Sequence, residues 1–141
     1  MSKNQNDCRD IETVLLRYAS ALDNKQYDRL REVFIPEATA NYVGLAECKG
    51  LDSIIELVSG VLDRCGPTQH LLGNVQADVH GNEATATCYL QAIHVGLGEY
   101  ADQLHTVWGE YRDRLVKTEA GWRISHRELA VIHAQGDIGL A

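Results

Sequence analysis

The sequence contains little proline, methionine and phenylalanine, and its few cysteines are widely separated. Among its 141 residues are two prolines, one methionine, one phenylalanine and four cysteines. The cysteines (Cys8, Cys48, Cys65 and Cys88) lie far apart and form neither a CxxC pair nor a zinc-ligand spacing. We therefore interpret them as reduced thiols, mostly small apolar fillers, and expect a cytoplasmic protein.

Long apolar runs and concentrated basic charge are also missing. The sequence has no stretch approaching the roughly 20 apolar residues that span a bilayer. Its opening segment, MSKNQNDCRD, lacks the apolar core of a secretory signal. The formal net charge is −7, and the 13 Lys and Arg are scattered. Nucleic-acid binding needs a concentrated basic face, so we expect no nucleic-acid partner. Because long apolar runs are missing, we expect no membrane partner either.

What remains has the composition of an ordinary globular protein. Hydrophobic residues make up 45% and charged residues 23%, which predicts a single domain over residues 1–141. Apolar residues at helical spacing predict an amphipathic helix over residues 7–23. A short second helix is predicted from Gln26 to Phe34, ended by Pro36, and a short strand over residues 38–43.

The rest of the chain reads as one more helix and a set of long strands. The third helix is predicted after Gly50, with a capping box at Ser53–Glu56 and an end at residues 65–67. Four strands are predicted over residues 68–79, 83–96, 103–117 and 121–133. Helices followed by antiparallel strands predict an α+β fold with the helices on one face of the sheet.

Alternation along the second long strand points to an unusual inner face. Small residues and one imidazole share this face: Ala84, Ala86, Cys88, Leu90, Ala92 and His94. Such a face is either the inner wall of a cavity or a surface closely covered by a helix. The alternation leaves both interpretations open.

Two residues far apart in the sequence have the types that form a general base. Asp23 closes the first helix, either as an exposed helix-end residue or cap, or as a buried carboxylate that orients a histidine. His70 shares a strand face with Leu72 and Asn74, and a buried imidazole there needs a hydrogen-bonding partner. A carboxylate such as Asp23 would fix its tautomer and raise its basicity.

Other candidates carry hydroxyl, imidazole or indole groups. Tyr18, Tyr42 and Tyr111 are either hydroxyl donors or core residues, and His94 faces inward by its phase. The sequence has no GxSxG, P-loop, GxGxxG or HExxH motif, and its histidines are not at metal-ligand spacing. We therefore expect no cofactor and no metal. Proton-transfer chemistry is favoured: elimination, isomerisation, aldol-type cyclisation or hydration.

Several short motifs occur in a fixed order along the chain: the segment from Tyr18 to Arg31, Asn41-Tyr42, Thr68-Gln69-His70, Ala92-Ile93-His94 and Gly121-Trp122-Arg123-Ile124. This ordered set resembles the scytalone dehydratase and SnoaL-like branch of the NTF2-like superfamily. The resemblance covers roughly residues 8–133. The chain departs from the dehydratase at Leu22, where that enzyme carries a tyrosine, and at Gly109 and Tyr111, where it carries polar residues.

The resemblance implies a cone of three N-terminal helices packed in a curved, mainly antiparallel sheet around one deep pocket. It also implies a homo-oligomer, trimer or dimer. The implied activity is a cofactor-independent dehydratase-type lyase acting on a small cyclic or polyketide-like carbonyl compound. An isomerase or cyclase, related dehydrochlorinases and a non-catalytic binding module remain alternatives. The expected catalytic residues are Asp23, His70, Tyr42 and His94, and the expected substrate-binding residues are Tyr18, Asn74, Trp108 and Tyr111.

Overall fold

The computed structural model describes residues 3–140, which form helices in the first half and long strands in the second. In chain order the elements are α1 (Lys3–Asp23), η1 (Tyr27–Glu32), β1 (Phe34–Tyr42), β2 (Ala46–Lys49), α2 (Leu51–Leu62), β3 (Thr68–His80), β4 (Glu83–Val95), η2 (Gly98–Tyr100), β5 (Leu104–Thr118) and β6 (Gly121–Gln135). Residues 1, 2 and 141 of the predicted domain lie outside the described residues. No helix within residues 3–140 is long and apolar enough to cross a membrane.

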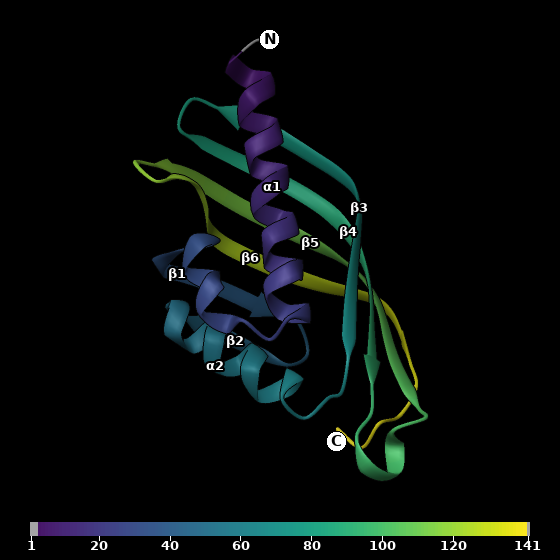
Figure 1. Ribbon diagram of the computed structural model, residues 1–141. Helices are drawn as coiled ribbons and strands as arrows, with labels where there is room; N and C mark the ends of the chain where they lie inside the picture. Colours follow the sequence, from purple (N-terminus) through teal and green to yellow (C-terminus); the bar gives the residue numbers. More distant parts are fainter. Residues whose placement is uncertain (1–2, 141) are drawn as a thin grey trace.

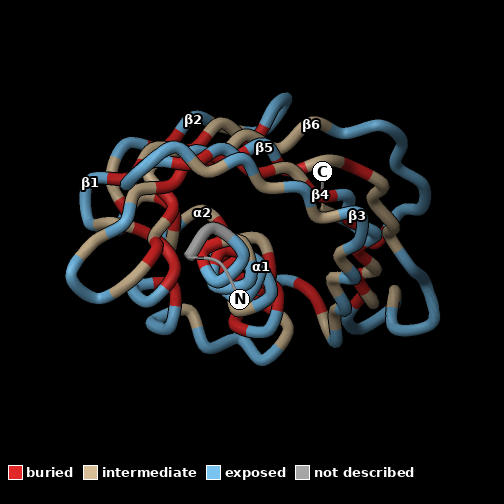
Figure 2. Tube along the Cα trace, turned by 90° about the horizontal axis from the view of Figure 1, so that it is seen from above, coloured by how far each residue is buried: buried red, intermediate tan, exposed pale blue. Residues whose placement is uncertain are grey.

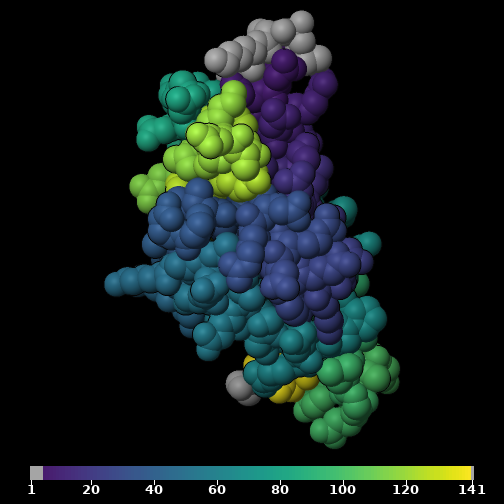
Figure 3. Space-filling model, turned by 60° about the vertical axis from the view of Figure 1, so that its left-hand side comes forward, coloured from purple at the N-terminus to yellow at the C-terminus, as the bar shows by residue number. Residues whose placement is uncertain are grey.

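The six strands form one mixed sheet that curves around α1. Their order is β2-β1-β6-β5-β4-β3, and β1 with β6 is a parallel pair in an otherwise antiparallel sheet. Figure 1 shows α1 lying across the sheet, and the end-on view in Figure 2 shows the strands arching over it. On the side shown in Figure 3, η1 and α2 form the surface, with C-terminal residues emerging below them. The predicted α+β class is confirmed.

The inner face of β4 fulfils both interpretations left open by its alternation. Its inward residues are buried along the whole strand. Ala84, Ala86 and Cys88 belong to the packed core that α1 helps to form. Leu90, Ala92 and His94, further along the same face, line a cavity. The long strands therefore extend beyond the part of the sheet that the helices fill.

The predicted helices need correction between residues 26 and 53. The second is a short 3-10 helix that ends at Glu32, so residues 3–140 contain two α-helices and not three. Pro36 lies within β1, where the register with β6 is irregular and a missing N–H is tolerated. The predicted capping box is wrong, because α2 begins at Leu51 with Gly50 as its N-cap and no side-chain cap bond. The φ angle of Gly50 is 93°, which favours glycine.

The first turns of α1 are fixed to the far end of the sheet by a buried carboxylate. Asp7 Oδ1 accepts hydrogen bonds from Trp122 Nε1 at 3.0 Å and from Lys117 Nζ at 2.9 Å. Only 5% of Asp7 is exposed, so both donors satisfy a group that would otherwise be costly to bury. These bonds position one end of α1, and Asp23 lies at the other end.

Candidate active site

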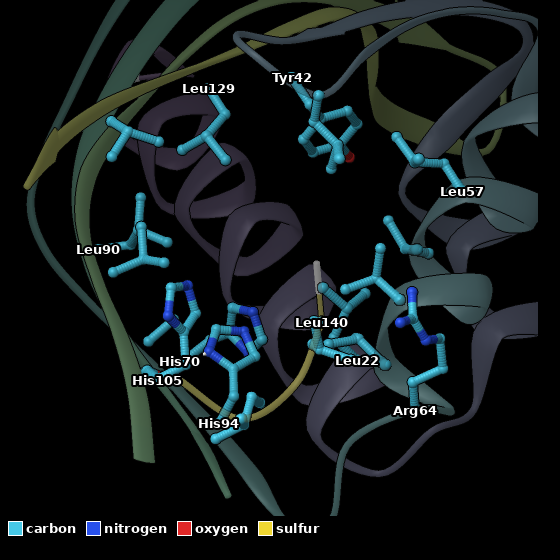
Figure 4. Close-up of a pocket in the computed structure, with 18 of the residues that line it drawn as sticks. Leu22, Tyr42, Leu57, Arg64, His70, Leu90, His94, His105, Leu129 and Leu140 are labelled. Atoms are coloured by element: carbon cyan, nitrogen blue, oxygen red, sulfur yellow. Dashed lines mark hydrogen bonds between the residues drawn. The ribbon is translucent and has the colours of Figure 1, made fainter. Parts of the chain in front are cut away.

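A cavity of about 520 Å³ lies where the sheet extends beyond the packed core. Most of its wall is aliphatic, from α1, α2, the long strands and the C-terminal segment: Leu22, Leu57, Val58, Val61, Leu62, Leu90, Ala92, Val107, Leu129, Val131, Ile138 and Leu140. Histidines gather at one end and Tyr42 lies at the other, as Figure 4 shows. An apolar wall with a few convergent polar groups is typical of a small-molecule site.

The Asp23 carboxylate at the end of α1 reaches the first residues of β3. His70 Nδ1 lies 2.7 Å from Asp23 Oδ1, and the His70 main-chain N–H donates to Oδ2 at 2.9 Å. Thr68 Oγ1 donates to Oδ1 at 3.0 Å. The predicted contact between the carboxylate and the imidazole is therefore present. Since Nδ1 is occupied, Nε2 is the nitrogen that His70 can offer to a ligand in the cavity.

These hydrogen bonds decide the charge of Asp23. Burial alone would raise the pKa of this carboxyl group, but hydrogen bonds from His70, its positive charge when protonated, and the Thr68 hydroxyl together lower the pKa below its usual value. Asp23 is therefore ionised at neutral pH, and its carboxylate accepts the hydrogen bond from Nδ1 of the His70 imidazole.

A lowered carboxyl pKa links folding stability to pH. The contribution of Asp23 is complete above the unfolded pKa, near 3.9, and is lost as the pH falls through the lower folded value. We expect Asp23→Asn to lower the free energy of unfolding by about 1–2 kcal/mol at pH 7, with the difference from wild type shrinking below pH ~4. Urea unfolding of both proteins at several pH values measures this. A difference that stays constant with pH would contradict it.

His94 and His105 continue the row of imidazoles beside His70. The ring centroids of His70 and His94 are 5.7 Å apart, as are those of His94 and His105. His94 Nδ1 donates to the His105 carbonyl at 2.9 Å, and His105 Nδ1 donates to the Gly136 carbonyl at 3.0 Å. A carbonyl only accepts, so each neutral ring carries its proton on Nδ1 and leaves Nε2 as an acceptor. Burial lowers the pKa of His94, which favours its neutral form.

His105 was not identified from the sequence, although a signal existed. On β5, alternation places His105, Val107, Gly109 and Tyr111 on one face, and three of these line the cavity. Within the described residues, no three His, Cys, Asp or Glu side chains are grouped so that they could hold a metal ion.

The opposite end of the cavity is formed by three tyrosines. The hydroxyls of Tyr18 and Tyr42 are 2.9 Å apart, and the Tyr111 ring meets the Tyr18 ring edge-on at 5.6 Å between centroids. All three rings are almost fully buried and line the cavity, and burial raises the pKa of each hydroxyl. They are therefore protonated at neutral pH and able to donate.

Behind these tyrosines lies a buried ion pair that the sequence analysis did not single out. Arg127 on β6 donates from Nε and Nη2 to the two carboxylate oxygens of Asp113 on β5, both at 2.8 Å. The side chains of both residues are fully buried. The pair is formed between directly opposite residues of neighbouring strands.

Two of the expected substrate-binding residues lie outside the cavity. Asn74 is exposed with a φ of 51°, at an irregularity in the β3–β4 register between Gly73 and Gln76. The irregularity reverses the alternation, so Asn74 does not share the face of His70. Trp108 is on the outer face of β5, where its ring lies 5.4 Å from that of His133. A regular strand cannot place both Trp108 and Tyr111 inward.

A family model described as a SnoaL-like domain matches residues 5–128. The chain belongs to the SnoaL-like domain family. An uncharacterised protein of Mycobacterium tuberculosis is 32% identical to this SnoaL-like chain over 123 residues, covering 86% of the chain and 82% of the relative.

Solved structures in the NTF2-like superfamily have the same fold. A protein of Novosphingobium aromaticivorans, provisionally named a scytalone dehydratase, is 25% identical, with 94% of this chain and 88% of that one covered and a TM-score of 0.85. A type 2 hexachlorocyclohexane dehydrochlorinase, LinA, is 16% identical, with 97% and 90% covered and a TM-score of 0.78. The second likeness concerns the fold alone.

Proposed function

We propose that this SnoaL-like chain is a cofactor-independent lyase that eliminates water from a small cyclic carbonyl compound. One observation carries the proposal: an imidazole backed by a carboxylate faces an apolar cavity whose opposite end presents tyrosine hydroxyls. The volume of about 520 Å³ suits a drug-sized molecule. The provisional name of the Novosphingobium protein points to the same reaction class.

His70 acts first as the base. Its Nε2 takes the proton from the carbon next to the substrate carbonyl, and the C–H electron pair forms an enolate. Asp23 stabilises the resulting imidazolium through Nδ1–H, because its ionised carboxylate lies 2.7 Å away. Tyr42 donates a hydrogen bond to the enolate oxygen, and the charge that builds there is stabilised most strongly in a cavity with little water.

His70 also supplies the proton that the leaving group needs. When the enolate returns its electron pair, the C–O bond breaks, and the hydroxyl leaves as water with the proton from His70 Nε2. His94 is a poor acid here, because burial lowers its pKa and its neutral ring offers only an acceptor to the cavity. We therefore assign His94 the role of accepting a hydrogen bond from the substrate hydroxyl.

The test is a panel of cyclic ketones that carry a hydroxyl on the carbon β to the carbonyl, with product masses read by mass spectrometry. We expect loss of one water from at least one compound, dependent on His70. A product of unchanged mass would replace the lyase by an isomerase, and ring formation would indicate a cyclase. Release of chloride from matched chloro-ketones would indicate a dehydrochlorinase. Binding of panel compounds without any conversion would contradict the enzyme and favour a binding module.

A further inference from the structure

The pair of Arg127 and Asp113 is an unusual structure to place behind a substrate cavity. Burying two charges is expensive, and a well-packed apolar pair of similar volume commonly serves a fold at least as well. The described sheet nevertheless holds this guanidinium and this carboxylate with no exposed side-chain surface. The fold alone gives no reason for a full positive charge at this position.

The guanidinium is positioned against the tyrosines that line the cavity. Its central carbon lies 4.2 Å from the centroid of the Tyr18 ring and 3.9 Å from that of the Tyr111 ring, so the cation contacts both aromatic rings. Its Nε and Nη2 are used by Asp113. Its Nη1 is buried without a hydrogen-bond partner among the described residues.

The charge of Arg127 reaches the cavity through the hydroxyl pair. Burial raises the pKa of Tyr18, and the positive charge of Arg127 opposes that rise. The Tyr18 and Tyr42 hydroxyls are 2.9 Å apart, and either can donate to the other. When Tyr42 donates to an anion in the cavity, Tyr18 donates to Tyr42, and a more acidic Tyr18 hydroxyl is the stronger donor. Tyr42 then becomes a stronger donor to whatever it contacts, because hydrogen bonds in a chain polarise one another.

We infer that Arg127 is a positioning residue that acts through Tyr18 and Tyr42 to make the tyrosine end of the cavity a binding site for an oxyanion. The oxyanion is an enolate or a phenolate, and the inference rests on the proposed function in naming the enolate as the natural ligand. Asp113 fixes the guanidinium between the two rings and offsets part of its charge.

The experiment uses 4-nitrophenol as the probe, because its absorbance reports whether the bound ring is ionised. The probe is titrated into the protein over a range of pH, which gives the affinity of the neutral and the anionic form and the pKa of the bound phenol. No turnover is needed. Failure of the proposed lyase would appear in the product screen alone, and failure of this inference in the phenol titration.

Removing both charges together keeps the fold testable. We expect the double variant Arg127→Met/Asp113→Leu to bind the anion about tenfold more weakly relative to the neutral phenol, equivalent to a bound pKa about one unit higher. Arg114→Met is the matched control, since Arg114 lies on the same strand as Asp113 but is exposed. Asp113→Asn removes the carboxylate charge and keeps the charge of Arg127, so the pKa of the bound phenol is expected to fall. Structural damage would not lower this pKa.

The route through the tyrosines is tested by a double-mutant cycle. In a Tyr18→Phe background, the Arg127→Met/Asp113→Leu change is expected to have little further effect on the bound pKa. The inference is overturned if the wild type does not bind the phenolate, or if the charge-free variant binds it as the wild type does. Equal losses for neutral and anionic phenol would overturn it as well, because they would indicate a packing role only.

Discussion

Replacing His70 by alanine is expected to reduce turnover of the substrate identified in the product screen by about 10²–10⁴-fold. The imidazole both removes the proton from carbon and returns it to the leaving hydroxyl in the proposed reaction, and among the described residues no second imidazole hydrogen-bonds to Asp23. Tyr42 and the apolar wall remain, so substrate affinity should change far less than the turnover number. Steady-state kinetics on the purified variant separates the two quantities.

The matched control for this variant is His80→Ala. His80 ends β3, the strand that carries His70, but its side chain is 73% exposed and lies away from the cavity. Circular dichroism should show both variants folded, with turnover retained only in His80→Ala. Turnover that persists in a folded His70→Ala protein would remove His70 from the mechanism and leave the cavity as a site without an assigned base.

The Asp23–His70 contact could be anticipated because its two partners lie in recognisable local patterns. The sequence predicts a helix that ends at Asp23 and a strand that begins at Thr68. The resemblance adds that Asp23 and His70 belong to one site. The structure adds what neither pattern contains, which is the main-chain donor from His70 that holds the second carboxylate oxygen. That bond depends on the exact approach of α1 to β3, a tertiary property.

The errors at Asn74 and at the start of α2 have local causes that composition conceals. A single irregularity in β3 reverses the inward phase after Gly73, and alternation counted from His70 cannot detect it. At α2, the sequence contains a capping-box pattern, but the N-cap is Gly50, whose N–H donates to the Ala38 carbonyl of β1 at 2.7 Å, and the helix begins at Leu51. In both places the local backbone conformation depends on a contact with another strand, which the local sequence does not reveal.

The buried ion pair is the part of the site that sequence reasoning missed entirely. Asp113 lies between two arginines in the sequence and Arg127 between a histidine and a glutamate, so both resemble residues of exposed strand faces. Their burial follows from the register of β5 with β6, which places them opposite each other on the inner face. Arg112 and Arg114 on β5 are charged as well, but alternation places their side chains on the exposed face of the strand.

Breaking this ion pair is expected to have the largest effect on stability of any change considered. Arg127→Met should lower the free energy of unfolding by about 3–5 kcal/mol, because it leaves the Asp113 carboxylate buried without its partner. The loss also includes the contacts of the guanidinium with the rings of Tyr18 and Tyr111. Urea unfolding followed by circular dichroism measures the change.

The cause of that loss can be isolated within the same pair of positions. Adding Asp113→Leu to Arg127→Met removes the orphaned charge, and most of the lost stability should return, because an apolar pair of similar volume is often as stable as a buried ion pair. Arg114→Met should stay within about 0.5 kcal/mol of wild type, since an exposed substitution there breaks no buried contact. A double variant no more stable than Arg127→Met would show that the tyrosine contacts of Arg127, and not the unpaired Asp113 carboxylate, dominate the loss.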